Sequence, residues 1–322
     1  MSRESAPSER ARRPKEPTFS IVIPAYNAAR TVEATLRSVL AQTEGDFEAI
    51  VVDDGSTDAT TQRVRAISSE RVRLVRQPNG GLAAARNAGV GAARGVFVSF
   101  LDSDDLWLPT YLAEMRGALE DRPEVAIAYT DAWVWHESIQ RFGRETIVAP
   151  VAPPAAPPDD PAELFRSLVA RNYFYVSTTV RREVLAQVGG FDQSVSPSED
   201  WDMWLRIAER GYRASRAAPV LAIYRMRAGS LSSNRAVMLE AERRVLRKTL
   251  SYDLDNTSRE LVETRLSTLE SSASRKVLQN KSGRPFPRLV PPVARVDHYR
   301  LTPPPGVPPA LVRLLRASGE SS

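Results

Sequence analysis

Short runs of apolar, mainly β-branched residues alternate with stretches of helical spacing over the early part of the chain. Four of these runs predict buried strands: Phe19–Ile23, Ala49–Val52, Val72–Val75 and Val96–Leu101. Between the first two runs, apolar residues recur at the spacing of one helix face: Val32, Leu36, Val39 and Leu40. Strands that alternate with helices are typical of βαβ units, so this part predicts an α/β fold built on a parallel sheet.

The pattern changes after a proline-rich stretch at Val148–Pro161, which we interpret as a linker. Beyond it the sequence predicts a helix, an extended segment and an acidic, aromatic helix, in that order: Ala162–Ala170, Tyr175–Val180 and Asp200–Ala208. Residues 236–280 predict two charged helices. Two helix starts carry local signals, since Asp58 is suited to an N-cap and Pro109 to the first turn of the helix after it.

Composition limits the chemistry that is open to the chain. Its 322 residues, 42% of them hydrophobic, can bury the core of one large domain or two joined ones. There is no cysteine, which excludes disulfides, thiolate metal sites and cysteine nucleophiles. The two histidines, His136 and His298, are too few for a His-rich zinc site and disfavour a Ser-His-Asp hydrolase. Catalysis would therefore rest on carboxylates.

Positive charge is concentrated at the two ends of the chain. The net charge is +5; residues 1–17 carry +2 and residues 281–322 carry +5, which leaves −2 for residues 18–280. This distribution argues against a nucleic-acid groove through the body and suits tails that are solvated or lie on an anionic surface. With no apolar leader and no span-length apolar stretch, we expect a cytoplasmic protein, with weak peripheral contact at the inner membrane face left open.

Polar residues follow three of the four predicted strands. They are Pro24-Ala25-Tyr26-Asn27 after the first strand, Asp53 to Asp58 after the second, and Asp102-Ser103-Asp104-Asp105 after the fourth. Ligands of an open α/β sheet bind beyond the carboxyl ends of its strands. We therefore expect the three loops to converge on one crevice.

The third loop places three carboxylates within four residues. Such groups repel one another unless a cation or hydrogen bonds neutralise them. Mg²⁺ and Mn²⁺ take oxygen ligands, commonly one or two carboxylates completed by phosphate oxygens and water, so the loop suggests a metal-diphosphate site. The alternative is that Asp104 or Asp105 simply caps the helix that starts near Pro109.

Two further signals are weaker on their own. In the second loop, Gly55 permits a tight turn and the neighbouring carboxylates can accept hydrogen bonds from a ligand, although an Asx turn with an N-cap explains the same pattern. Later, Asn79-Gly80-Gly81 leads into a helix with a small-residue face, from which Arg86 could meet phosphate. For the alanines of that helix we favour close packing as the explanation.

Taken in order, four stretches resemble the donor-binding half of family 2 glycosyltransferases of the GT-A fold. They are Ser20 to Asn27, Val51 to Asp58, Gly80 to Gly89 and Phe100 to Asp105. The resemblance is strong to residue 107, looser to about residue 230, and absent from the terminal tails. It implies a Rossmann-like nucleotide-binding half and an acceptor half on one mixed central sheet, followed by C-terminal helices.

The same resemblance implies roles for individual residues. A nucleotide-binding role falls on Pro24, Ala25, Tyr26, Asp54, Arg86 and Asp102. Asp54 would meet the base, and Asp102 and Asp104 would form the DxD motif of the family. Asp104 and Asp105 would hold a Mg²⁺ or Mn²⁺ ion, whereas Asp53 would be mainly structural.

A second acidic motif, Ser198-Glu199-Asp200-Trp201, resembles the acceptor motif of the same family. By that resemblance Asp200 is the general base, which takes the proton of an acceptor hydroxyl as its oxygen attacks the anomeric carbon. Glu199 would be a cap or support, and Trp201 or Trp204 would stack on a sugar or pack the cleft, with Trp204 favoured as core.

The chain departs from the family after its Tyr224-Arg225 pair, where relatives often have a histidine and this sequence has Arg227. An arginine there could hold the diphosphate, since a guanidinium binds phosphate with two N–H groups. It could not act as an acid near neutral pH.

The pattern and the resemblance together divide the chain into five segments. They are a disordered N-terminal tail (1–17), a nucleotide-sugar-binding half (18–130), an acceptor-binding half (131–235), a helical extension (236–280) and a Pro-rich basic tail (281–322).

We therefore expect an inverting glycosyltransferase. It would move a sugar from a nucleoside-diphosphate sugar, in the first place a UDP-sugar, to a hydroxyl of a sugar, lipid-linked sugar or other glycoconjugate. One alternative is a nucleotidyltransferase, which should carry a glycine-rich basic loop where this chain has Pro24-Ala25-Tyr26-Asn27. The other is a non-catalytic relative that binds sugar nucleotides, against which the retained Asp104, Asp105 and Asp200 argue. Nucleic acid is not expected as a partner.

Overall fold

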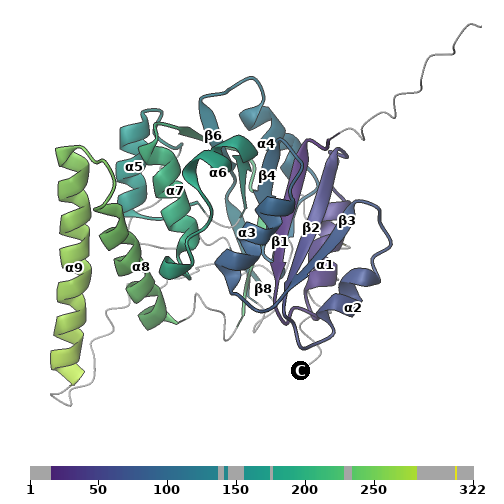
Figure 1. Cartoon of the computed structure of the whole chain (residues 1–322), viewed down its shortest axis with the longest axis horizontal. Helices are drawn as coiled ribbons and strands as arrows, with labels where there is room; N and C mark the ends of the chain where they lie inside the picture. The colour runs from purple at the N-terminus through teal and green to yellow at the C-terminus, as the bar shows by residue number, and fades with distance from the viewer. Residues whose placement is uncertain are drawn as a thin grey trace, which may run out of the picture.

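A seven-stranded mixed sheet forms the centre of the protein (Figure 1). The computed structural model describes residues 16–136, 141–143, 156–174, 177–227, 234–280 and 309. In spatial order the strands of the sheet are β10 (Arg213–Arg216), β6 (Val125–Tyr129), β9 (Thr178–Arg181), β4 (Phe97–Phe100), β1 (Phe19–Ala25), β2 (Phe47–Asp54) and β3 (Val72–Gln77). All of their pairings are parallel except those of β9, which runs antiparallel to both β4 and β6.

A smaller sheet lies beside the loop Asp102–Asp105, which follows β4 and is called the strand-end loop below. Its order is β5 (Leu106–Trp107), β11 (Ala222–Met226), β7 (Ala132–His136) and β8 (Arg141–Gly143). Because β5 directly follows the Asp102–Asp105 loop and pairs with β11, this sheet brings residues 222–227 next to that loop.

Helices cover both faces of the central sheet, and alternate residues of its strands point into the two layers. Ile21 and Ile23 of β1 pack into one core with α1 (Val32–Leu40), α2 (Thr60–Arg65) and α4 (Tyr111–Leu119). Val22 packs into the other core with α3 (Leu82–Ala92), α5 (Pro161–Ala170), α6 (Arg182–Val188) and α7 (Glu199–Glu209). Since both faces are buried, the strands appear in the sequence as continuous apolar runs.

The small-residue face of α3 allows it to lie very close to the sheet. A Cβ atom added at Gly89 would stand 2.3 Å from a methyl carbon of Val22 on β1. Ala83 and Ala85 are buried on the same helix. Close packing therefore explains this face, as expected, and a larger residue at 89 would push the helix off the sheet.

The predicted fold class is confirmed. The four predicted strands appear as β1, β2, β3 and β4, and the predicted helices in the second half appear as α5 and α7. The two charged helices are α8 (Arg235–Thr249) and α9 (Asn256–Asn280). Two strands from the second half, β9 and β10, complete the sheet of the first, so the two halves share one sheet.

Three local expectations are corrected. Ala59, not Asp58, occupies the N-cap of α2, although a carboxylate oxygen of Asp58 accepts the backbone N–H of Thr60. Pro109 precedes the N-cap Thr110 of α4 and so lies outside its first turn. The extended segment expected at 175–180 is a strand only from Thr178, and residues 175–176 lie outside the described residues. Of the two predicted tails, residues 1–15, 281–308 and 310–322 also lie outside the described residues.

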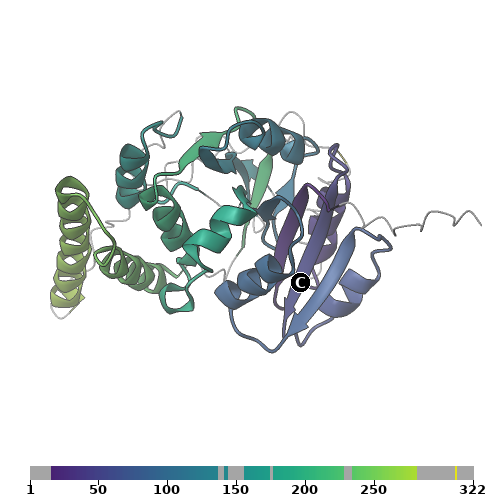
Figure 2. The ribbon, with the colours of Figure 1, turned by 45° about the horizontal axis from the view of Figure 1, so that its top comes forward.

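The α8–α9 pair stands at the end of the molecule opposite β3 (Figures 1 and 2). Lys248 of α8 forms two ion pairs with the body of the protein. Its Nζ lies 2.6 Å from a carboxylate oxygen of Asp192 and 2.9 Å from a carboxylate oxygen of Asp202, which is fully buried on α7. The hydroxyl of Tyr252 donates to Asp202 at 2.7 Å. Of the helices described, none is both long and apolar enough to cross a bilayer.

Candidate active site

The loops after β1 and β2 are bound to each other at the carboxyl edge of the sheet. Asn27, in the left-handed region at φ +49°, accepts the backbone N–H of Thr57 at 2.9 Å through its side-chain oxygen. Its own backbone N–H donates to the hydroxyl of Ser56 at 3.0 Å. Between these bonds, Ala25 is buried and Tyr26 projects outward with 52% of its surface exposed. Of the three residues expected to line a nucleotide pocket, Tyr26 is thus the one that offers a side chain.

The two carboxylates that end β2 have different partners. Asp53 is fully buried and accepts the backbone N–H of Ser56 at 2.9 Å and the hydroxyl of Thr61, which agrees with the structural role expected for it. Asp54 accepts the backbone N–H groups of Gly80 and Gly81, both at 2.9 Å, and the amide of Gln77 at 2.7 Å. Asp54 therefore holds the glycine turn that leads into α3.

If Asp54 contacts the nucleobase, its carboxylate must accept that hydrogen bond in addition to these three. Two of them reach Oδ1 and one reaches Oδ2. Because a carboxylate oxygen has two lone pairs, one acceptor position on Oδ2 can take a ligand N–H.

The loop after β4 is held from two sides. The hydroxyl of Thr35 on α1 lies 3.0 Å from the carbonyl oxygen of Ser103 and 2.9 Å from that of Asp105. From the other side, the backbone N–H of Arg225 on β11 donates to Asp105 at 2.8 Å, and its Nε donates to the carbonyl oxygen of Asp104 at 2.9 Å. These carboxylates lie before β5, several residues from α4, so the alternative in which they cap that helix is wrong.

The three carboxylates of this loop differ in access. Asp105 is 3% exposed, whereas the side chains of Asp102 and Asp104 are 26% and 21% exposed. Burial, followed by repulsion from Asp102, raises the pKa of Asp104, and burial with repulsion from Asp104 and Asp102 raises that of Asp105 further. The exposed positions belong to Asp102 and Asp104, so Asp105 is the less accessible of the two expected metal ligands.

Arg227 joins the same loop from the end of β11. Its Nε lies 3.1 Å from a carboxylate oxygen of Asp104, and its side chain is 40% exposed. This guanidinium thus stands next to the carboxylates of the loop after β4, where it was expected to meet a diphosphate.

Arg86 is placed differently from the phosphate contact expected of it. Its guanidinium is nearly buried and donates to Glu199 at 2.7 Å and to Asp102 at 3.0 Å. The next residue, Asn87, exchanges two hydrogen bonds with the backbone of Phe191, at 2.7 and 2.8 Å. Successive residues of α3 therefore connect the strand-end loop to the segment that carries Asp200.

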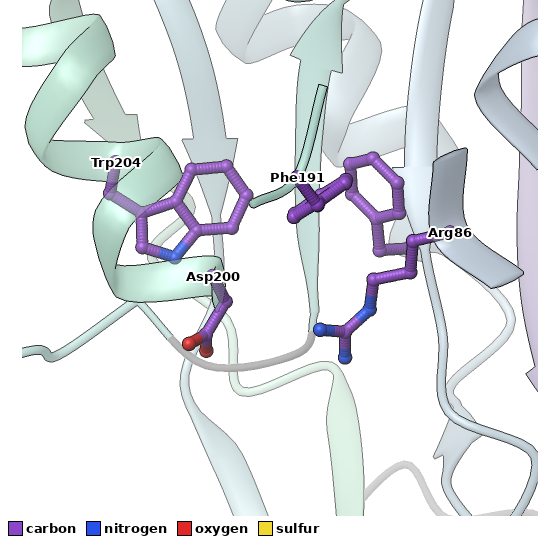
Figure 3. Close-up of a pocket in the computed structure, with 5 residues that line it drawn as sticks. Arg86, Phe191, Asp200 and Trp204 are labelled. Carbon is purple, nitrogen blue, oxygen red and sulfur yellow. The ribbon is translucent and has the colours of Figure 1, made fainter. Parts of the chain in front are cut away.

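Asp200 lies in a small pocket that Arg86, Phe100, Phe191 and Trp204 also line (Figure 3). The guanidinium of Arg86 stands 5.7 Å from the centre of the Phe191 ring, a cation–π distance. Burial, and then repulsion from Glu199, raises the pKa of Asp200 to about 6, although the charge of Arg86 opposes the rise. The pocket therefore holds a carboxylate that is ionised at neutral pH and is a stronger base than an ordinary aspartate.

Both tryptophans of α7 are buried, as was expected for Trp204, but only Trp204 also lines the pocket. Trp201 is 2% exposed, and its indole N–H donates to the carbonyl oxygen of Leu168 on α5 at 2.8 Å. It packs between two helices and does not line the pocket. Trp204 is also 2% exposed, but it does line the pocket beside Asp200. A ring that contacts a ligand would be that of Trp204.

Two residues of the site were not anticipated. Thr35 lies among the apolar residues on the buried face of α1, and a polar residue on such a face was a signal that could have been followed. Asn172 donates to Asp200 at 3.4 Å from the loop between α5 and β9. Its surrounding sequence has no periodicity, so no local signal pointed to it.

The side chains at the strand-end loop fit a divalent metal. Asp102 and Asp104 present accessible carboxylate oxygens, the ligands that Mg²⁺ and Mn²⁺ prefer, and phosphate oxygens and water commonly complete such a site. Within the described residues, no three His, Asp or Glu side chains are arranged to hold a metal ion by themselves.

Comparison with known proteins agrees with this geometry. The model of "Glycosyl transferase family 2" matches residues 20–186. RfbC of Myxococcus xanthus, an O-antigen biosynthesis protein, is 33% identical over 204 residues, which are 62% of this chain but only 15% of that protein. WfaP of Escherichia coli, a UDP-Glc:alpha-D-GlcNAc-diphosphoundecaprenol beta-1,3-glucosyltransferase, is 29% identical over 231 residues, 71% of this chain and 85% of that protein.

Solved structures share the fold. The S. aureus TarS fragment 1–349 in complex with UDP-GlcNAc has a TM-score of 0.62 at 21% identity, covering 79% of this chain and 73% of that one. The mannosyltransferase PcManGT from Pyrobaculum calidifontis, in complex with GDP-Man and Mn²⁺, has a TM-score of 0.61 at 19% identity, covering 94% and 86%. Since the family match spans more than half of the sequence, the chain belongs to glycosyl transferase family 2 and is a glycosyltransferase of the GT-A fold.

Proposed function

We propose that the protein transfers a sugar from a nucleoside-diphosphate sugar, in the first place a UDP-sugar, to an acceptor hydroxyl with inversion at the anomeric carbon. The observation that carries this proposal is the buried guanidinium of Arg86, which joins Asp102 to Glu199, the neighbour of Asp200. A donor at the strand-end loop and an acceptor at Asp200 would then lie on either side of one fixed side chain.

Asp200 would act as the general base. Its carboxylate would accept the proton of the acceptor hydroxyl while that oxygen attacks the anomeric carbon and the bond from this carbon to the diphosphate breaks. A pKa of about 6 suits this role, because the group is ionised at neutral pH and yet binds a proton more strongly than a solvated aspartate.

The donor diphosphate would be held at the strand-end loop. Asp102 and Asp104 would hold the Mg²⁺ or Mn²⁺ ion, with Asp105 behind them, and Arg227 would offer the phosphates its N–H groups. When bound, the metal would neutralise the charge that develops on the departing diphosphate. Pro24, Ala25, Tyr26 and Asp54 would contact the nucleoside from the neighbouring strand ends.

Similar proteins support the choice of substrates. The name of WfaP specifies a UDP-glucose donor and a lipid-diphosphate-linked acceptor, and TarS was solved with UDP-GlcNAc. We therefore infer a UDP-sugar donor and an acceptor that belongs to a growing polysaccharide or glycolipid.

A calorimetric screen of UDP, GDP, TDP and CMP, each with and without Mn²⁺, tests the donor assignment. We expect one nucleotide to bind in a metal-dependent way and chelation of the metal to abolish this binding. Replacing Asp104 by Ala should weaken the binding at least about tenfold, or about 1.4 kcal/mol. Glu114→Ala, which removes an exposed carboxylate of α4, should leave it unchanged. If all four nucleotides fail to bind the unmodified protein, the donor assignment is wrong and a non-catalytic role is favoured.

The pH dependence of transfer tests the base. Because Asp200 is active only when ionised, kcat/KM should be constant above its pKa and fall about tenfold per pH unit below a value of about 6. Nucleotide binding measured in the same buffers separates this effect from protonation of the strand-end carboxylates. A kcat/KM that does not change as the pH is lowered through 6 would rule out the assignment.

A further inference from the structure

Four buried polar atoms of residues that line the Asp200 pocket, or bond to residues that line it, have no hydrogen-bond partner in the described part of the structure. Two are donors, Arg86 Nε and Trp204 Nε1, and two are acceptors, Glu199 Oε2 and Asn172 Oδ1. Leaving such an atom unpaired costs roughly 1–3 kcal/mol, so folded proteins contain few of them. Two of them, Trp204 Nε1 in the pocket and Asn172 Oδ1 of the residue that bonds to Asp200, point to a polar ligand that satisfies this pair when it binds.

The indole N–H of Trp204 is directed into the pocket. Its ring packs edge-on against Phe174, with the ring centres 6.3 Å apart at an angle of 66°. The indole nitrogen lies on the edge of the ring that faces Asp200 (Figure 3). One turn of a helix separates the two residues, so they share a face of α7. The N–H of Trp201 offers a contrast, since the carbonyl oxygen of Leu168 already accepts it.

The amide of Asn172 borders the same carboxylate from another segment. Its Nδ2 donates to Asp200 Oδ2 at 3.4 Å. This bond sets the orientation of the amide, because the reverse orientation would place an amide oxygen against a carboxylate oxygen. The amide oxygen is therefore the atom of Asn172 that can meet a ligand.

The chemistry of this pair of atoms selects a class of ligand. Trp204 Nε1 can only donate and Asn172 Oδ1 can only accept. A phosphate oxygen would satisfy the first but not the second, and an ammonium group would do the reverse. A hydroxyl group both accepts and donates, so it can satisfy both atoms.

We propose that Trp204 Nε1 and Asn172 Oδ1 bind a second hydroxyl of the acceptor, adjacent to the hydroxyl that Asp200 deprotonates. This inference rests on the proposed function. The acceptor is then a sugar or similar polyol with neighbouring hydroxyls, and an isolated alcohol is a poor substrate. An ordered water could occupy the same place in the free protein, and the acceptor hydroxyl would displace it.

The indole N–H signals of the full-length protein in NMR spectra test this directly. The chain has five tryptophans, and Trp204→Phe and Trp201→Phe identify two of the signals. The labelled protein is titrated with methyl glycosides of glucose, galactose, mannose and N-acetylglucosamine, with UDP and Mg²⁺ present and absent. Cyclohexanol, a ring of similar size with one hydroxyl, is the matched control.

We expect at least one glycoside to shift the Trp204 signal downfield, as a new hydrogen bond does, while the Trp201 signal stays in place. Cyclohexanol should not reproduce the shift. In Asn172→Leu, which keeps the volume but removes the amide, the apparent Kd for the glycoside should rise about 5- to 10-fold.

The inference is overturned if no glycoside moves the Trp204 signal, which would mean that only water fills the site. It is equally overturned if cyclohexanol moves the signal as much, or if Asn172→Leu binds the glycoside as well as the unmodified protein. None of these readouts requires turnover. A failure of the proposed transferase activity would instead appear as absent nucleotide binding in the calorimetric screen.

Discussion

Replacing Asp200 by Asn should lower the rate of sugar transfer by about 10²- to 10⁴-fold, the usual contribution of a positioned general base. Asparagine has the same size, and its amide oxygen can still accept the bond that the backbone N–H of Trp201 makes with Asp200 at 2.7 Å. It cannot take up a proton from a hydroxyl. Steady-state kinetics should show the loss in kcat, while calorimetry should show nucleotide affinity within about twofold of the unmodified protein. Full activity in this variant would refute the assignment of the base.

A stability measurement shows whether such a loss comes from unfolding. The pKa of Asp200 is raised in the folded protein, from 3.8 to about 6, so its ionised form costs stability, and that cost grows as the pH rises through this interval. Asp200→Asn should therefore have a Tm equal to or above that of the unmodified protein at neutral pH, with the difference lost in acid.

Asp192→Asn provides a control of opposite sign. Although burial opposes it, hydrogen bonds from Lys248 and Ser194 lower the pKa of Asp192 to about 2. Its ionised form thus stabilises the fold above the unfolded pKa, and this contribution is lost as the pH falls towards 2. The variant should have a lower Tm at neutral pH, with the difference shrinking in acid. The same sign for both variants would contradict the environments described for these two carboxylates.

Replacing Arg86 by Met should destabilise the protein by about 3–5 kcal/mol, because it leaves Glu199 charged, fully buried and without its partner. For a protein of this size, that loss corresponds to a fall in Tm of about 10 °C. Transfer should also fall, since the strand-end loop and the segment that carries Asp200 lose their common contact. Thermal unfolding and kinetics of the same preparation measure both effects.

The double variant Arg86→Met/Glu199→Gln separates the charge effect from packing. It removes both members of the buried pair, so it should recover at least half of the lost stability while activity stays low. The exposed pair Arg37 and Glu33 on α1, joined at 2.8 Å, is the surface control. Arg37→Met should change the stability by less than about 1 kcal/mol. If the double variant is no more stable than Arg86→Met, the loss is one of packing and the buried-charge argument is wrong.

Much of the fold could be predicted because each signal was local. The continuous apolar runs of β1 and β2 indicate strands that are buried on both faces, and this can be recognised without knowing which elements cover them. The apolar pattern of α1 repeats with each turn of its own helix. The strand ends could be placed together because the carboxyl ends of parallel strands meet at one edge. Consistent with this, Asn27 at the end of β1 bonds to the loop that follows β2.

The partners of Arg86 could not be predicted, because they come from distant parts of the chain. Glu199 is 113 residues away, and the spacing around Arg86 carries no information on which carboxylate meets it. A phosphate and two protein carboxylates make equal chemical sense for an arginine at that position. Only the packing of α3 against the sheet and against the turn Gln193–Val195, which precedes α7, chooses between them.

The sequence alone determined the first four strands of the sheet and the helix between the first two, the position of the carboxylates at the strand ends, and the family. These features follow from periodicity and motif spacing, which can be read from neighbouring residues without knowledge of distant contacts. The tertiary structure decided which of Trp201 and Trp204 lines the pocket, and that Asn172 reaches Asp200. The physical reason is that α7 is buried along most of its length, so its apolar pattern does not distinguish a side that meets another helix from a side that meets a ligand.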